Sequence, residues 1–312
     1  MGIQRLSVVS LVTAVLTASL LGGCARSIRG QKVDIDGIKL SQEHPTVVEV
    51  ENWNGSIRVI ADPTVKQPIV SAKVRATSKK APKAGTMWEA VDVTATASIT
   101  GTERLLKVVS APATNPPKDV AVDLTIKVSK VAATRIRNSG GGIELVRVNG
   151  PVTVENGVGG GPGGDIQLRT GEVMTYPATL VTTAGKVIYQ VGVGSTGQFD
   201  LQAEKGETVF TTRTGELDGV VPNEGHYRAT FNKGTNPVIL RTGDGVVTAR
   251  VMENAATYGP EVWDGTFKWP SKPRIIGRLG GYYNDEPARL PWQKKPAPAP
   301  AASTPPETVG GQ

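Results

Sequence analysis

Hydrophobic and polar residues alternate along much of the first half of the chain. The alternation is clearest in residues 120–128, where every second side chain from Val120 to Val128 is apolar and can face a core. Similar segments, rich in Val, Ile and Thr and separated by Gly, Pro and Asn, are residues 46–51, 56–60, 69–76, 91–99 and 105–109. Only residues 83–90 suggest a short helix. The pattern predicts an all-β protein with an amino-terminal β-strand region at residues 35–132.

The sequence pattern changes at residues 133–254, where the expected strands are short and turns that contain glycine are closely spaced. Three pairs of turn glycines share a spacing of 28 residues: Gly157 with Gly185, Gly206 with Gly234, and Gly215 with Gly243. A short strand cannot bury its apolar face alone, so repeated short strands favour stacking into coils. We therefore expect a Gly-rich β-solenoid, similar to a parallel β-helix, with a β-sandwich as the alternative all-β fold.

The tetrapeptide Arg-Thr-Gly-Glu occurs at residues 169–172 and 213–216, and as Arg-Thr-Gly-Asp at residues 241–244. Each copy carries an acid three residues after its arginine, namely Glu172, Glu216 and Asp244. We expect each arginine to be neutralised by its own acid across a glycine bend. The tetrapeptide then marks a recurring corner of the fold and not an anion site.

These strand and turn patterns resemble the putative adhesin family, β-solenoid domains of bacterial envelope proteins whose function is unassigned. The residues that carry the resemblance are 48–61, 122–128 and 136–171, in which a strand ends at Asn and Gly and Ile begins the next strand. The likeness spans roughly residues 46–251. The resemblance implies the fold and no specific chemistry.

The first residues have the organisation of an export signal. One charged residue, Arg5, precedes an apolar run of small residues at 6–21, and Leu-Gly-Gly then stands directly before Cys24, the only cysteine of the chain. This order resembles a bacterial lipoprotein signal, which implies cleavage of residues 1–23, lipidation of Cys24 and attachment to a membrane, with residues 24–34 as a tether. Because Ala25 follows the cysteine, the expected location is the outer membrane or the cell surface.

Composition narrows the chemistry further. The net charge of +7 is spread along the sequence, which gives no basic stripe for nucleic acid. With its single cysteine assigned to the anchor, the mature chain has no disulfide and no thiolate metal site. Stability must then come from burial and hydrogen bonding.

Two glycine-rich stretches, residues 159–164 and 192–197, fit the spacing G-x-G-x-x-G. A dinucleotide site needs a helix after this loop, whereas alternating strand-like residues follow both stretches. Residues 160–165 also begin like a calcium-binding nonapeptide, but Gln167 replaces the large apolar residue of that repeat and no tandem copy follows. We expect mobile loops and neither cofactor nor metal at these positions.

Catalytic candidates are few. The two histidines, His44 and His226, are expected at the surface, too few for a histidine-based relay or metal centre. Acids near the repeats could in principle serve a β-helix polysaccharide enzyme, although acids beside turns are usually solvated. They are Asp165, Glu172, Asp200, Glu204, Glu207, Glu216, Asp218 and Asp244.

Two segments complete the expected organisation. Residues 255–292 hold seven aromatic residues and predict an end cap, with a binding surface as the alternative. Residues 293–312 are rich in Pro and Ala and predict a disordered tail.

The sequence therefore predicts a lipid-anchored envelope protein with a non-catalytic structural or adhesin-like role, contacting envelope polysaccharide or a protein partner. A carbohydrate-active β-helix enzyme and an accessory lipoprotein of an envelope assembly or signalling complex are the alternatives.

Overall fold

The computed structural model describes residues 30–257 except 41, 79–87, 101 and 114–118. These residues form strands and one short 3-10 turn, η1 (Val158–Gly160), without an α-helix, which confirms the all-β prediction. The strands are β1 (Gln31–Val33), β2 (Ile35–Gly37), β3 (Thr46–Asn52), β4 (Ile57–Ala61), β5 (Ile69–Ala76), β6 (Val91–Thr100), β7 (Glu103–Pro112), β8 (Val120–Val128), β9 (Val131–Asn138), β10 (Ile143–Val146), β11 (Val152–Asn156), β12 (Ile166–Arg169), β13 (Ala178–Thr182), β14 (Val187–Val191), β15 (Gly197–Thr212), β16 (Leu217–Asn223), β17 (His226–Phe231) and β18 (Pro237–Val251).

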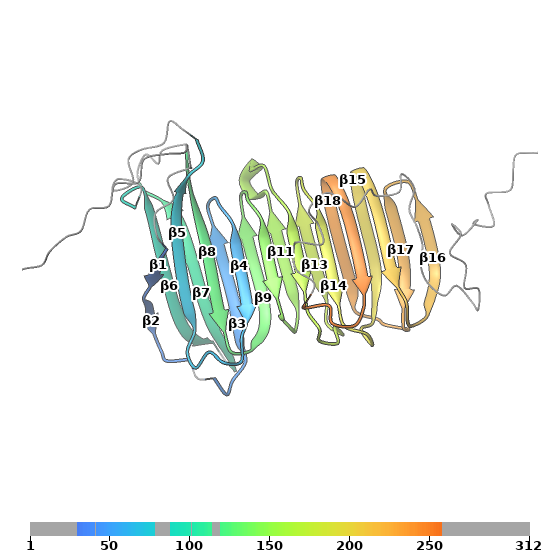
Figure 1. Ribbon diagram of the computed structural model, residues 1–312, viewed down its shortest axis with the longest axis horizontal. Coiled ribbons are helices and arrows are strands. Elements are labelled where there is room, and N and C mark those ends of the chain that lie inside the picture. The colour runs from blue at the N-terminus through green and yellow to red at the C-terminus, as the bar shows by residue number, and fades with distance from the viewer. Residues whose placement is uncertain (1–29, 41, 79–87, 101, 114–118, 258–312) are drawn as a thin grey trace, which may run out of the picture.

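The strands stack along the long axis of the molecule in two ladders (Figure 1). Ladder 1 runs in the order β2, β6, β7, β3, β9, β11, β13, β18, β15, β17, β16. Ladder 2 runs in the order β1, β5, β8, β4, β10, β12, β14, β18, β15. The long strands β15 and β18 contribute their first halves to ladder 1 and their second halves to ladder 2.

The core lies between the two ladders and follows from the alternation in the sequence. Inward side chains stand opposite one another in rows, and one row of ladder 2 runs through Leu124, Ile57, Ile143, Ile166 and Val187. All five are at most 2% exposed. Burying a side chain of this size contributes about 2 kcal/mol, which no single short strand could gain by itself.

The order of the strands in space differs from their order in the chain. Strand β3 lies between β7 and β9, and β18, the last strand that the structure describes, lies between β13 and β15. Both therefore stand inside the stack and not at its ends. Antiparallel pairs lie toward both ends instead: β5 with β8 and β6 with β7 at the amino-terminal end, where the short strands β1 and β2 stand outermost, and β17 with β15 and β16 at the other end. These return strands pair with edges that would otherwise be open templates for aggregation.

The placement of β18 overturns the 28-residue spacing as a structural repeat. Gly206 lies opposite Gly245 and not opposite Gly234, and Lys205 lies opposite Asp244. The hairpin formed by β16 and β17 separates β15 from β18 in the chain, and its length sets the true offset. Equal spacing of turn glycines was therefore a coincidence of turn positions.

A row of glycines forms the corner where the chain passes from ladder 1 to ladder 2. At Gly141 φ is +100°, and a Cβ would lie 2.5 Å from the carbonyl oxygen of Gly55 in the adjacent turn. At Gly245 φ is +147°, and a Cβ would lie 2.1 Å from the oxygen of Gly185. Only glycine fits such a close approach of backbones at positive φ. The stacking itself thus requires the glycine-rich turns seen in the sequence.

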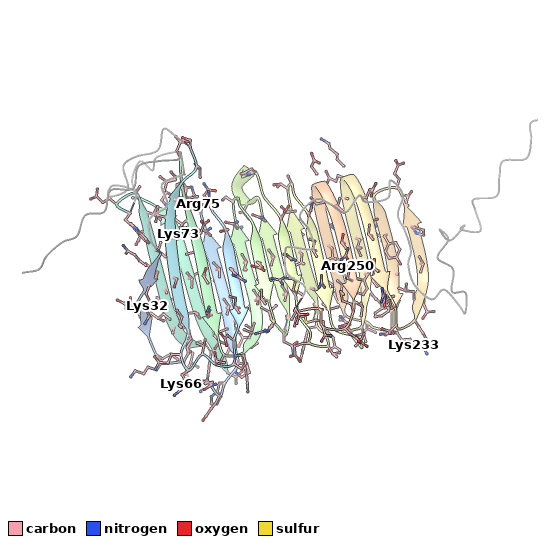
Figure 2. The ribbon with its side chains drawn as sticks, viewed as in Figure 1. Lys32, Lys66, Lys73, Arg75, Lys233 and Arg250 are labelled. Carbon is pink, nitrogen blue, oxygen red and sulfur yellow. The ribbon has the colours of Figure 1, made fainter. Side chains whose placement is uncertain are left out.

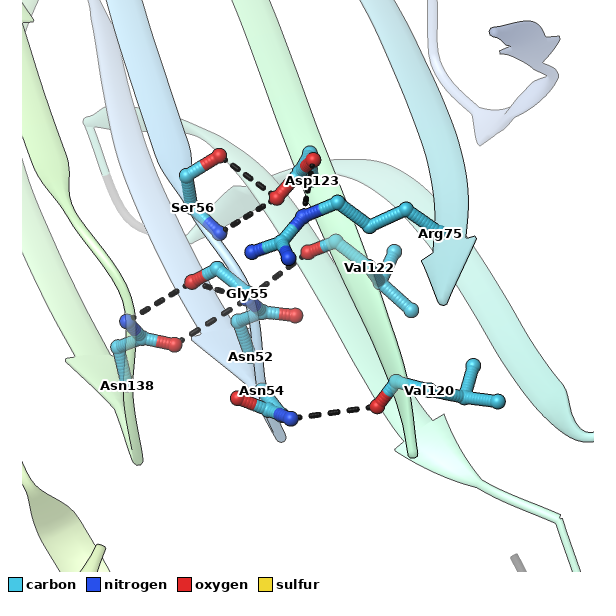
Figure 3. Close-up of polar contacts among 9 residues, drawn as sticks. All are labelled: Asn52, Asn54, Gly55, Ser56, Arg75, Val120, Val122, Asp123 and Asn138. Carbon is cyan, nitrogen blue, oxygen red and sulfur yellow. Dashed lines mark hydrogen bonds and ion pairs between the residues drawn. The ribbon is translucent and has the colours of Figure 1, made fainter. Parts of the chain in front are cut away.

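Buried amides run beside this glycine row. Asn52, Asn138 and Asn156, here called the asparagine row, are each the last residue of a strand and lie opposite one another in ladder 1. The Nδ2 of Asn52 donates to Oδ1 of Asn138 at 3.1 Å, and Nδ2 of Asn138 donates to Oδ1 of Asn156 at 3.1 Å. Figure 3 shows the first of these contacts beside Gly55 and Val122. Each amide also holds corner carbonyl groups, so the row ties neighbouring turns together.

Five aromatic rings fill the core at the carboxyl-terminal end: Tyr189, Phe199, Phe210, Tyr227 and Phe231. The centroids of Phe199 and Phe210 lie 4.9 Å apart in an edge-to-face arrangement. Burial raises the pKa of both tyrosine phenols. The aromatic cap predicted at residues 255–292 lies almost wholly outside the described residues, as do the tail at 293–312, Cys24 and most of the helix expected at 83–90.

Candidate binding groove

A groove of about 710 Å³ opens on the outer face of ladder 1, where β11, β13, β18 and β15 lie side by side. Thr179 and Val181 of β13 lie in its middle. Its remaining lining comes from Glu155, Asn156, Gly157, Val158, Thr182, Thr183, Gln202, Glu204, Arg241, Thr242 and Gly243. Most of these residues carry polar side chains.

Strand alternation explains why these side chains point outward. Leu180 of β13, Leu240 of β18 and Leu201 of β15 are fully buried neighbours in one row, so the residues beside them must face solvent. The next row places Arg241 directly between Val181 and Gln202. Adjacent strands are about 4.8 Å apart, which fixes the spacing of the groups across the groove.

Arg241 is oriented by a neighbouring acid. Its Nη2 lies 3.6 Å from Oδ2 of Asp200, whose Oδ1 lies 2.8 Å from Nε2 of His226. Arg228 also approaches Asp200, at 3.7 Å. Because Asp200 is held by three partners and is only 23% exposed, it anchors one edge of the groove.

His226, expected at the surface, is partly exposed at 31%. Within the described part of the chain its ring is hydrogen-bonded to Asp200 and to no Ser or Thr hydroxyl. His226 and Asp200 therefore correspond to the base and the orienting acid of a Ser-His-Asp relay, but among the described residues no hydroxyl nucleophile is hydrogen-bonded to the histidine.

Two acids line the groove itself. Glu155 forms an ion pair with Arg137 at 3.3 Å, whereas Glu204 forms no ion pair with any residue between 30 and 257 that the structure describes. Glu204 is exposed at the end of the groove, where it can accept hydrogen bonds from a ligand.

The other acids named from the sequence do not converge on this site. Asp165 accepts a hydrogen bond from the amide of Lys186 at 2.7 Å, and Glu216 lies 3.9 Å from Lys233. The remaining four, Glu172, Glu207, Asp218 and Asp244, are not among the lining residues, although Asp244 follows Gly243 of the lining. Among the described residues there is no cluster of three or more His, Cys, Asp or Glu able to hold a metal ion.

The expectation that each Arg-Thr-Gly-Glu copy neutralises itself is wrong. Arg169 pairs with Glu144 on the neighbouring strand β10, and Arg241 pairs with Asp200 on β15. In both pairs the acid stands on the adjacent strand, two positions from the residue directly opposite the arginine, a diagonal that long side chains can reach. The third copy lies in the turn after β15, where Glu216 faces Lys233.

The two glycine-rich stretches are loops followed by strands, β12 and β15, and neither leads into a helix. The first loop contributes Val158 to the wall of the groove. The groove residues Thr179 and Gln202 carried no motif in the sequence, and Arg241 begins the Arg-Thr-Gly-Asp copy that was expected to be a corner and not a binding site. As groove residues, their only signal was an outward position in an alternating strand.

No helix in the described residues is long and apolar enough to cross a membrane. No protein-family model and no curated protein sequence matches the chain.

Solved bacterial structures do resemble it. A putative cell adhesion protein from Clostridium sporogenes covers 72% of this chain and 99% of its own length, at 10% identity and a TM-score of 0.42. A putative adhesin from Parabacteroides merdae covers 74% of this chain and 96% of its own length, at 10% identity and a TM-score of 0.28. A putative adhesin from Bacteroides fragilis covers 72% of this chain and 97% of its own length, at 10% identity and a TM-score of 0.26. The chain is thus similar to proteins named as adhesins, as the sequence predicted; at these TM-scores we argue function from its own residues.

Proposed function

We propose that this chain is a lipid-anchored protein of a bacterial cell envelope that binds an extended polysaccharide, without chemical change, in the groove on ladder 1. The observation that carries the proposal is the groove lining, in which Thr179, Gln202, Glu204 and Arg241 present hydrogen-bonding groups from neighbouring strands. The lining side chains stand on a rigid parallel sheet, so little order has to be gained on binding.

A saccharide fits this surface better than a protein partner does. Protein interfaces centre on buried aromatic and aliphatic anchors, and Val158 and Val181 are the apolar side chains of the lining. A polysaccharide presents hydroxyl groups along its length, which match the donors of Gln202 and Arg241 and the acceptor of Glu204. A polymer contacts several strands at once, and its affinity grows through this multivalency.

We further infer that the two ladders form an imperfect β-solenoid with two strands in each coil. Support comes from parallel, in-register pairing of β3, β9, β11 and β13 in ladder 1, each followed in the chain by β4, β10, β12 or β14 of ladder 2. The order of the first residues supports the anchor at Cys24 and an outer-membrane or surface location.

Binding is tested by screening envelope polysaccharides against the mature chain, residues 24–312, with the Arg241→Ala variant alongside. We expect the variant to bind the retained polymer about tenfold more weakly, the loss of one charge-assisted hydrogen bond. Arg228→Ala is the matched control, because Arg228 contacts the same Asp200 but does not line the groove. Equal loss in both variants, or in neither, would contradict a binding role for the groove.

A carbohydrate-active enzyme is the second candidate, and the exposed carboxylate of Glu204 in the groove is the observation that favours it. The same incubations are therefore analysed for released saccharides. Cleavage that disappears in Glu204→Gln while polymer binding persists would replace the non-catalytic role by a catalytic one. Polymer binding that is absent altogether would contradict the groove proposal and leave the accessory lipoprotein of an envelope assembly or signalling complex as the alternative.

A further inference from the structure

Positive side chains gather on the outer face of ladder 2 at the amino-terminal end of the stack. They are Lys32 on β1, Lys73 and Arg75 on β5, Lys127 on β8 and Lys66 in the turn between β4 and β5. We name these five residues the basic face. Figure 2 shows Lys32, Lys66, Lys73 and Arg75 at the same end of the molecule.

Strand register places these side chains outside the core. Lys32 lies opposite Ser71, and Lys73 lies opposite Asp123, while Ala72 and Val74 on either side of Lys73 are fully buried. Lys32 and Lys66 are exposed, and Lys73 is partly exposed. The lysine positions therefore serve no packing role in the core.

Most of this charge has no internal partner. Arg75 is bound to Asp123, with 2.8 Å between Nε and Oδ2, and Ser56 donates to the same carboxylate (Figure 3). Lys32, Lys66 and Lys73 form no ion pair with any residue that the structure describes. Three ammonium groups thus remain available to a negatively charged surface.

The outer face of ladder 1 at the same end has the opposite charge. Acids stand there on four strands: Asp36, Asp92, Glu103, Glu49 and Glu51. Lys107 lies between two of these acids, and the hydrogen bonds that its ammonium group donates to Glu51 and then to Glu49 raise its pKa. Arg135 and Arg137 of β9 also stand on this face, and they pair with Glu103 and Glu155. Acids still outnumber bases there, so the amino-terminal end is positive on ladder 2 and negative on ladder 1.

The chain enters the fold beside the basic face. Strand β1 begins at Gln31, seven residues after Cys24, so the tether spans at most about 25 Å. Ile69, 38% exposed, lies opposite Lys127 and adds an apolar group at the same face. A lipid on Cys24 would hold these lysines within reach of the bilayer surface.

We propose that the basic face docks on the phosphate headgroups of the anionic bilayer that carries the Cys24 anchor. Docking through ladder 2 turns ladder 1 away from the membrane, which leaves the groove open to polymers. Each Lys or Arg near an anionic surface adds to membrane attraction, and salt screens that attraction. The inference rests on the proposed anchor for proximity and is independent of what the groove binds.

Lysine footprinting tests this proposal. The described strands all lie within residues 30–257, so the mature chain from Cys24 keeps each of them. Its single thiol is coupled to a maleimide lipid in vesicles of phosphatidylcholine, with or without phosphatidylglycerol, which makes the anchor independent of lipidation in the cell. An amine-reactive reagent then reports the exposure of each lysine by mass spectrometry.

On vesicles containing phosphatidylglycerol, we expect labelling of Lys32, Lys66 and Lys73 to fall about threefold or more and to recover at high salt. Lys205 and Lys233, exposed at the other end of the stack, are the controls and should label equally on both vesicles. Equal labelling of the basic face on both vesicles, or equal protection of the controls, overturns the proposal.

A charge-reversed variant, Lys32→Glu with Lys66→Glu and Lys73→Glu, tests whether the protection of the lysines depends on their charge or only on the closeness to the bilayer that the tether imposes. It should leave Lys127 equally labelled on both vesicles while circular dichroism remains that of the wild type. Protection of the basic face by a soluble anionic polymer, without protection on anionic vesicles, would identify a polymer as the partner and overturn membrane docking. Failure of the groove proposal would instead appear in the Arg241→Ala comparison, which these vesicles do not affect.

Discussion

The asparagine row should be a main source of stability, and Asn138→Ala tests this directly. Asn138 is fully buried and donates through Nδ2 to the oxygens of Gly55 at 3.1 Å, Gly140 at 2.9 Å and Asn156 Oδ1 at 3.1 Å. Its Oδ1 accepts from Asn52 at 3.1 Å. Alanine at this position can form none of these hydrogen bonds.

The magnitude follows from the hydrogen bonds of the Asn138 side chain. A hydrogen bond contributes about 1 kcal/mol net, and each buried group left without a partner costs about 1–3 kcal/mol. Asn52 keeps other acceptors for its amide, and the oxygens of Gly140 and Gly55 keep the Gly55 amide and the Asn52 side chain as donors. The largest cost therefore arises at Oδ1 of Asn156. We expect a destabilisation of about 3–5 kcal/mol.

Urea denaturation of the mature chain, followed by circular dichroism, measures this destabilisation. The control is Asn149→Ala, because Asn149 is only partly buried and its side chain accepts one local hydrogen bond from Gly150. We expect the control to be destabilised by about 1 kcal/mol or less. An effect of Asn138→Ala no larger than that of the control would refute the structural role of the row.

Three further predictions follow from the structure. Gly141→Ala should destabilise the fold by more than about 3 kcal/mol, because the added Cβ would collide with backbone atoms. Gly159→Ala is the control: φ is also positive there, but no atom lies within 4 Å of the added Cβ, so we expect a cost of about 1 kcal/mol. Equal destabilisation of the two variants in urea denaturation would refute the steric account. Burial raises the pKa of Tyr189 and Tyr227, so their contribution to the free energy of unfolding should be fully present below about pH 10 and fall above it, where the phenols of the unfolded chain lose their protons. Changing both residues to Phe should reduce this loss of stability in melts at alkaline pH. An unchanged pH profile in the double variant would contradict the role of the two phenols. Cys24→Ala should abolish incorporation of labelled palmitate in cells, and membrane attachment that survives unchanged would contradict the anchor.

The sequence predicted individual strands well where one face is apolar and the other carries charge. The expected segments at residues 69–76 and 120–128 match β5 and β8, because Lys73 and Asp123 each stand between two buried apolar side chains. Local alternation determines which residues face the core, and this information is contained within each strand.

Strand order was not predictable in the same way. Strand β18 lies between β13 and β15, although the hairpin of β16 and β17 separates it from β15 in the chain. The pattern within a strand does not specify which other strands it pairs with. The aromatic core was missed for a related reason, since its rings are scattered from Tyr189 to Phe231 and meet only after stacking.

The groove depends on that same insertion. Arg241 comes to lie between Val181 and Gln202 only because β18 enters the ladder there, and each of these residues alone is an ordinary outward position. Glu204 and Asp200 were among the acids named from the sequence, but their separate roles, one lining the groove and one holding Arg241, required the fold.

The binding role of the groove is tested most directly by comparing two double variants in equilibrium titrations with the polysaccharide retained in the screen. Thr179→Ala with Gln202→Ala removes two hydrogen-bonding groups from the groove, and Thr96→Ala with Gln198→Ala removes the same groups from outer positions of ladder 1 that do not line it. We predict binding about 10–30-fold weaker for the groove variant and unchanged for the control. A groove variant that binds like the wild type, a control that weakens equally, or a chain that binds no polysaccharide would contradict the proposal.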